Sequence, residues 1–225
     1  MKLSTPVVLA LALAALPAVG GGEGESRAEL RSALGRTPDF RHGEQLYETC
    51  AACHGSNGGG VSDGSVPAIA GQHYRVIVKQ LVDFRHDRRW DIRMEHFTDR
   101  HRLPGPQDLA DLAAYVSVMQ RTNHPGTSDP ELLRRGAQVY FAGCATCHGP
   151  TGEGDDEQLV PRLAGQHSVY LIRQFYDAVD GRRPNMGGEH AKRLAKLDRE
   201  EILGVADYLS RLLSTPEQAG MKGDL

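Results

Sequence analysis

The sequence lacks aromatic residues and any surplus of positive charge. Phe, Trp and Tyr make up only 6% of the 225 residues, while glycine and proline contribute 26 and 12. This is little bulky material for the cores of two domains of ordinary size, so we expect a non-protein group to fill part of the interior. The net charge of -3 argues against nucleic acid as a partner.

No apolar run reaches the roughly 20 residues that a membrane-spanning helix needs. The longest uncharged run follows Lys2, extends from Pro6 to Val19 and ends beside the small residues Ala18 and Gly20. This pattern predicts a secretory signal peptide over residues 1–20, with an uncleaved anchor as the alternative. We therefore expect an exported protein with no transmembrane span in the mature chain.

The chain has four cysteines, and they form two Cys-x-x-Cys-His motifs with none left over. The motif residues are Cys50, Cys53 and His54 in the first copy and Cys144, Cys147 and His148 in the second. In this motif both thiols add to a haem and the histidine binds the iron, so the sequence predicts two covalent haem c groups. The alternatives are a redox-active dithiol, a four-cysteine zinc site and a pair of disulfides. None of these requires a histidine after both pairs.

The two motifs belong to an internal repeat. At an offset of 94 residues, the sequence PAIAGQH at 67–73 lies over PRLAGQH at 161–167. On both flanks the match runs at an offset of 93, as for Gly43 with Gly136 and Tyr47 with Tyr140. The chain is therefore a tandem duplication with small insertions between the matching segments.

Each repeat has the pattern of helices joined by glycine-rich loops, without sustained alternation of apolar and polar residues. This predicts an all-α fold. Asp198 with Glu201 forms a capping box that starts the last helix, and Pro106 is suited to the first turn of its counterpart. The glycines that open the repeats, Gly43 and Gly136, should let the last helix of the same half approach closely. We expect Tyr47 and Tyr140 to be core residues.

A haem iron also needs a sixth ligand or an open position, and methionine is the first candidate. Met186 lies in a Gly/Pro loop 38 residues after His148, and Met94 lies 40 residues after His54. The two align if the first loop is two residues longer, so we predict both as iron ligands. His96 is an alternative to Met94. We expect His73 and His167, which precede helices, to be surface or capping residues.

The duplicated motif, the PxLAGQ block at 161–166, the paired arginines before each methionine and the LAAY helix together resemble the two-haem class I cytochromes c of the c4 family. The resemblance implies two tandem cytochrome c domains related by a pseudo-twofold axis, each around a covalent haem with His/Met ligation. It also implies that the carbonyls of Pro67 and Pro161 accept hydrogen bonds from the haem-binding histidines. We place domain 1 at residues 36–124, domain 2 at 125–215 and a C-terminal tail at 216–225.

If methionine closes both irons, one-electron transfer is the remaining chemistry. The sequence then predicts an electron carrier, not an enzyme, that passes electrons from a respiratory donor to a terminal oxidase or another acceptor. Its partners would be redox proteins, including membrane-bound oxidases or reductases. The alternatives are a cytochrome subunit of a periplasmic dehydrogenase complex and a haem enzyme acting on peroxide or sulfur compounds.

Overall fold

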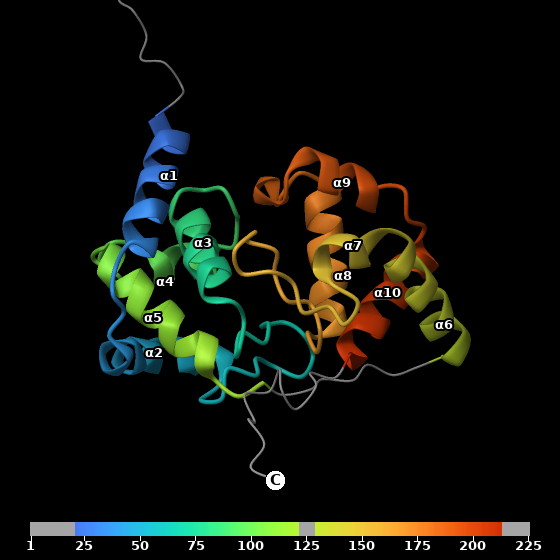
Figure 1. Cartoon of the computed structure of the whole chain (residues 1–225), viewed down its shortest axis with the longest axis horizontal. Helices are drawn as coiled ribbons and strands as arrows, with labels where there is room; N and C mark the ends of the chain where they lie inside the picture. The colour runs from blue at the N-terminus through green and yellow to red at the C-terminus, as the bar shows by residue number, and fades with distance from the viewer. Residues whose placement is uncertain (1–20, 122–128, 213–225) are drawn as a thin grey trace, which may run out of the picture.

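A computed structural model describes residues 21–121 and 129–212, and these form two helical lobes side by side (Figure 1). The described ranges contain no strand beyond one isolated antiparallel bridge between Asp155 and Val160. The all-α prediction is therefore confirmed. The predicted signal peptide, residues 1–20, and the predicted tail, residues 216–225, lie outside the described residues.

The first lobe contains the helices α1 to α5. Their bounds are α1 Gly21–Leu34, α2 Phe40–His54, α3 Tyr74–Arg85, α4 Ile92–Thr98 and α5 Pro106–Val118. Asp39 and Asp91 start α2 and α4 by accepting hydrogen bonds from backbone amides of the first turn. Helix α1 was not foreseen from the sequence; it packs on α3 and α5, and its Ala33 is fully buried in the first core.

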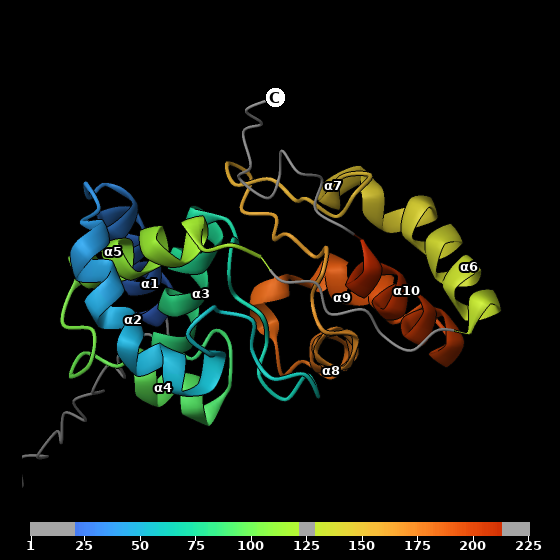
Figure 2. The same cartoon turned by 90° about the horizontal axis from the view of Figure 1, so that it is seen from below.

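The second lobe repeats this arrangement, but its chain is divided among more and shorter helical segments. Its elements are α6 Pro130–Val139, the π-helix η1 Tyr140–Cys144, α7 Ala145–His148, α8 Ser168–Val179, the 3-10 helix η2 Pro184–Met186, α9 Gly188–Leu194 and α10 Arg199–Arg211. Asp198 and Glu201 form the predicted capping box at the start of α10, with reciprocal bonds of 2.9 and 3.0 Å. Figure 2 shows α6 and α10 lying alongside each other at the far end of this lobe.

The first and last helices of each repeat pack at a glycine, as predicted. A Cβ atom on Gly43 would lie 2.1 Å from the carbonyl oxygen of Asp111, and one on Gly136 would lie 2.0 Å from that of Gly204. Either contact is far inside van der Waals distance, so only glycine permits this approach. Beside each crossing a tyrosine packs on a tyrosine of the last helix, with ring centroids 5.5 Å apart in both lobes: Tyr47 of α2 on Tyr115, and Tyr140 at the start of η1 on Tyr208.

The π-helix η1 absorbs a one-residue insertion. Two residues separate Tyr47 from Cys50 in the first repeat, and three separate Tyr140 from Cys144 in the second. Both tyrosine hydroxyls nevertheless donate to the same main-chain position, the carbonyl of Gly55 at 2.7 Å and that of Gly149 at 2.5 Å. The wider π turn accommodates the extra residue, so tyrosine and motif keep the same relation in both lobes. The core role predicted for these tyrosines is confirmed.

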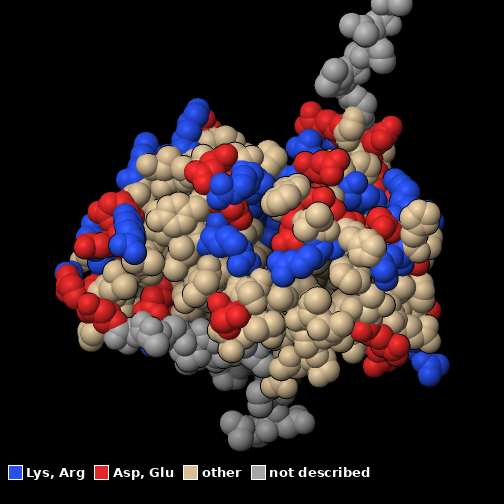
Figure 3. Space-filling model, turned by 180° about the vertical axis from the view of Figure 1, so that it is seen from behind, with Lys and Arg blue, Asp and Glu red and all other residues tan. Residues whose placement is uncertain are grey.

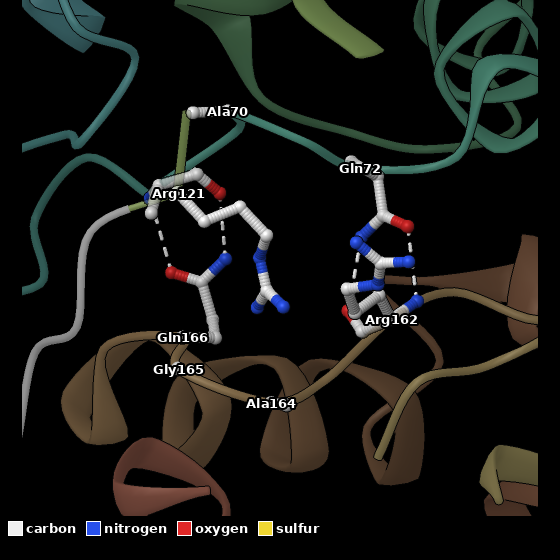
Figure 4. Close-up of a pocket in the computed structure, with 8 residues that line it drawn as sticks. Ala70, Gln72, Arg121, Arg162, Ala164, Gly165 and Gln166 are labelled. Atoms are coloured by element: carbon white, nitrogen blue, oxygen red, sulfur yellow. Dashed lines mark hydrogen bonds between the residues drawn. The ribbon is translucent and has the colours of Figure 1, made fainter. Parts of the chain in front are cut away.

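The lobes meet in a reciprocal interface built by the duplicated glutamine. The side-chain amide of Gln72 exchanges two hydrogen bonds with the main chain of Arg162, both of 2.9 Å. Gln166 does the same with the main chain of Ala68, at 2.7 and 3.0 Å (Figure 4). Each residue of one pair matches its counterpart in the other at the repeat offset of 94. The two pairs of contacts are therefore related by the pseudo-twofold axis between the two domains.

The histidines after these glutamines extend the interface. His73 precedes α3 and His167 precedes α8, but neither side chain caps its helix. Instead, Nε2 of His73 bonds the carbonyl oxygen of Glu153 at 2.7 Å, and Nε2 of His167 bonds that of Gly59 at 2.8 Å. His167 is only 3% exposed. The expectation of a surface position was therefore wrong for His167, and the expected capping role was wrong for both, because the other domain supplies a partner that the local sequence does not show.

Candidate haem sites

The two Cys-x-x-Cys-His motifs lie at corresponding helix ends. Cys50, Cys53 and His54 occupy the end of α2, while the second motif spans the end of η1 and all of α7. All four thiols are free of disulfides, and Cys53 and Cys147 are exposed. The two pairs lie in different domains, so they do not form one four-cysteine zinc site. Within 21–121 and 129–212, no group of three or more His, Cys, Asp or Glu side chains could hold a metal ion.

The motif histidines are buried and oriented by a proline carbonyl. Nδ1 of His54 donates to the carbonyl oxygen of Pro67 at 3.0 Å, and Nδ1 of His148 donates to that of Pro161 at 3.0 Å. Both bonds agree with what the resemblance implies. The bond places the proton on Nδ1 and leaves the lone pair of Nε2 for a metal. Burial lowers the pKa of both imidazoles, which favours the neutral form that binds metal.

The donor set fits two haem c groups. Each domain combines two free thiols at i and i+3 on a helix end with an adjacent histidine that has one ring nitrogen available. In each motif one thiol is partly buried and the other exposed, and burial raises the pKa of the buried thiol of Cys50 to about 11. A dithiol redox centre needs a thiol of lowered pKa, so this arrangement favours haem attachment over thiol chemistry.

In the first domain, the structure separates the two candidate sixth ligands, Met94 and His96. Met94, in α4, is partly buried and packs against the first hydrophobic core. His96 is exposed, and its Nε2 lies 3.1 Å from Nη2 of Arg102. This orientation supports Met94 as the ligand, which remains a prediction.

A buried ion pair fixes the far end of α4. Arg85 donates to the carbonyl oxygens of Thr98 at 2.8 Å and Leu103 at 2.6 Å, and its charge is met by Glu29 of α1 at 2.5 Å. The hydroxyl of Thr98 in turn donates to the carbonyl oxygen of Met94 at 2.8 Å. Helix α1 therefore supports the turn that contains Met94.

The second domain offers two candidate side chains for the sixth ligand. Met186 ends η2 and is partly buried against the second core. Four residues later, in α9, the ring of His190 lies 6.2 Å from the ring of His148, centroid to centroid. Nothing in the sequence singles out His190, because a lone histidine in a polar loop gives no periodic or repeated signal. The assignment of Met186 as a ligand stays a prediction.

The domains also meet along a charged seam between α3 and α8. Arg89 donates to Gln80 at 2.7 Å and to Gln174 at 3.0 Å across the interface, and it also contacts the hydroxyl of Tyr170. Arg183, its counterpart in the second repeat, is partly buried nearby. Burial and the charge of Arg89 lower the pKa of Arg183 to about 9. On the outer surface, basic and acidic side chains are interspersed over both lobes (Figure 3).

Comparison with known proteins identifies the same two units. The family model described as "Cytochrome c" matches twice, at residues 40–120 and 133–213. Cytochrome c4 of Azotobacter vinelandii is 33% identical over 193 residues, which cover 77% of this chain and 89% of that protein. The crystal structure of reduced cytochrome c4 from Pseudomonas stutzeri superposes with a TM-score of 0.69 at 30% identity, covering 79% of this chain and all of the other.

A more distant relative is described by a different role. The "thiosulfate dehydrogenase electron acceptor" of Stutzerimonas stutzeri is 27% identical over 173 residues, covering 72% of this chain and 78% of that protein. Like the cytochromes c4, it aligns with most of this sequence. The repeated haem motif, the histidines held by proline carbonyls, the reciprocal interface and these matches together show that the chain belongs to the cytochrome c4 family of electron-transfer proteins with two covalent haem c groups.

Proposed function

We propose that this protein is a periplasmic carrier that passes single electrons from a respiratory donor to a terminal oxidase or another acceptor. The observation that carries this proposal is the use of all four cysteines in two haem motifs whose histidines are already oriented for iron. No further thiol is present to act as a reactive ligand or nucleophile. The haems, once bound, supply reversible one-electron chemistry.

The chain's own residues have positioning roles in this function. The four cysteines would attach the two haems, and His54 and His148 would bind iron through Nε2 while the carbonyls of Pro67 and Pro161 hold the orientation of the two rings. Met94 is proposed as the sixth ligand of the first iron. A methionine in that position leaves no coordination site for a substrate, which favours a carrier over an enzyme.

Export is part of the same proposal. Haem attachment through Cys-x-x-Cys-His and the predicted signal peptide over residues 1–20 both fit a periplasmic location. Among the residues that the structure describes, no helix has the length and apolar character to cross a membrane. Fractionation of cells and N-terminal sequencing of the mature protein test this: we expect a periplasmic protein that begins close to residue 21.

A second function is favoured by one relative. The similarity to a protein described as an electron acceptor of thiosulfate dehydrogenase supports a role as the cytochrome partner of a periplasmic dehydrogenase. The two roles differ in the partner, not in the haem sites.

Rapid mixing of the purified holoprotein separates these functions. A carrier should take up two electrons per chain from a donor and return them to oxidase-containing membranes, without turnover of peroxide or thiosulfate by the chain alone. Stable copurification with a dehydrogenase would favour the second role. Multiple turnovers of peroxide or thiosulfate by the isolated chain would contradict both.

A further inference from the structure

The second domain has a histidine where the first domain has Met94. Helices α4 and α9 correspond: both have seven residues, both precede the last helix of their domain, and both end on a buried residue, Thr98 or Leu194. Met94 is the third residue of α4, and His190 is the third residue of α9. Met186 precedes α9 in η2, an element with no counterpart between α3 and α4 in the described first domain.

The distance between His190 and His148 suits two imidazoles on one metal ion. A metal–imidazole nitrogen bond is about 2.0 Å long and the ring centroid lies about 1.1 Å beyond the nitrogen, so trans imidazoles have centroids about 6.2 Å apart. The observed separation is 6.2 Å, with the ring planes inclined by 57°. Neither stacking nor a direct hydrogen bond between the two rings would fix their centroids at this separation.

The imidazole of His190 has no other role in the described structure. Within residues 21–121 and 129–212 it makes no hydrogen bond or ion pair, and its Nδ1 is buried without a partner. A buried polar nitrogen left unpaired is costly. His148, on the other side, has its Nδ1 engaged by Pro161 and its Nε2 available. Both rings therefore have a nitrogen lone pair that is not used within the described structure.

We propose that His190, not Met186, is the sixth ligand of the second haem iron. The second haem then has two histidine ligands, while the first has His54 and Met94. This inference deepens the proposed function and rests on it, because it assigns different ligands to the two haems of one carrier. Methionine ligation raises a haem potential relative to histidine, so the second domain is the electron-entry end and the first domain the exit.

The oxidised wild-type holoprotein gives a direct test without any substitution. Near-infrared magnetic circular dichroism distinguishes low-spin ferric haems with two histidines from those with histidine and methionine. We expect equal amounts of both types, and a sulfur-to-iron charge-transfer absorption equivalent to one haem per chain. Two haems of the His/Met type would overturn the proposal.

Three variants sharpen the test. Met186→Leu keeps the side-chain volume and should leave the two near-infrared haem signals and both haem potentials unchanged. Met94→Leu should abolish the sulfur-to-iron charge-transfer absorption. His190→Met should convert the two-histidine band to the His/Met type and raise the lower potential. Loss of half of the sulfur band in Met186→Leu would overturn the assignment.

The haem content of each preparation is measured first by mass spectrometry. Fewer than two covalent haems in the wild-type chain would contradict the proposed function itself. Two haems with two sulfur-ligated irons would contradict only the assignment of His190.

Discussion

The two domains hold the haem-binding histidine in the same way but differ on the opposite side of the site. In the first domain, the helix that contains Met94 is fixed by Arg85, whose charge is met by Glu29 of the additional helix α1. In the second domain, Val179 stands at the position of Arg85, and the corresponding helix contains His190. After the duplication, the attachment half of each site was kept while the sixth-ligand half diverged. One fold can therefore hold two haems of unequal potential.

The largest expected effect is the separation of the two haem potentials. With methionine on one iron and histidine on the other, we expect the first haem to lie higher by on the order of 0.1–0.3 V, a part of the roughly 0.8 V that axial ligands span. An optically monitored redox titration of the holoprotein should show two separate one-electron steps.

A ligand substitution in one domain shows which of the two measured potentials belongs to that domain. Met94→His should lower the higher potential and leave the lower one nearly in place. A haem potential of the first domain below that of the second would contradict the expected order of the two potentials, whatever the iron ligands are.

The support of α4 by α1 gives the next largest effect. Glu29→Gln leaves the buried guanidinium of Arg85 without its counter-charge, which should destabilise the first domain by about 3 kcal/mol. Denaturant unfolding followed at each haem measures this, and the second domain is the internal control. Glu25→Gln changes an exposed carboxylate of the same helix and should have almost no effect. Equal losses in both domains would contradict a role confined to the first.

The same ion pair predicts an acid sensitivity. Burial alone would raise the pKa of Glu29, but hydrogen bonds from His86 and Arg85 and the nearby charges lower it below the ordinary 4.5. A lowered carboxyl pKa stabilises the fold above the pKa of the unfolded state and ceases to do so as pH falls through the folded value. The first domain should therefore lose stability below about pH 4.5, and Glu29→Gln should lack this step. Retention of the step in the variant would assign it to another carboxylate.

Alanine at the helix crossings should have a smaller and equal effect in the two domains. Gly43→Ala and Gly136→Ala each place a methyl group about 2 Å from a carbonyl oxygen, which forces the helices apart at a cost of about 1–3 kcal/mol. Thermal unfolding of each domain measures the loss. Gly24→Ala, where an added Cβ meets nothing within 4 Å, is the matched control. A marked difference between the two crossings would show that the repeats have diverged in their packing as well.

The smallest effect is expected at the domain interface. Gln72→Ala and Gln166→Ala each remove two interdomain hydrogen bonds, worth about 1–3 kcal/mol together, and the pseudo-twofold relation predicts equal consequences. Small-angle X-ray scattering should show a looser pair of domains with both haems intact. Gln158→Ala, whose side chain bonds within its own loop, serves as the control. Unequal loosening would mean that one half of the interface dominates.

Much of the fold and the haem attachment could be predicted from the sequence because those features are local or repeated. The Cys-x-x-Cys-His motif has a fixed spacing on a helix, and the capping box at Asp198 lies within four residues. The close approaches at Gly43 and Gly136 were visible because a glycine and a tyrosine recur together in both repeats. Repetition supplied the signal that a single domain would not have given.

The remaining features depend on partners far away in the chain. His167 binds a carbonyl 108 residues away, and Glu29 meets Arg85 across 56 residues, so neither contact has a local pattern. The alignment of Met94 with Met186 relied on residue type and needed a gap of two. The helices align Met94 with His190 instead, because the register of a short helix against its domain is set by packing.

The glutamine interface has a consequence for how this chain can evolve. Each glutamine recognises a peptide group, and the side chains at those two positions, Ala68 and Arg162, have nothing in common. A contact made to the main chain survives almost any substitution at the recognised residue. A single ancestral domain with this glutamine would already possess both halves of the contact and could pair with a copy of itself. Fusion of two copies then preserved the pairing while leaving the recognised positions free to vary.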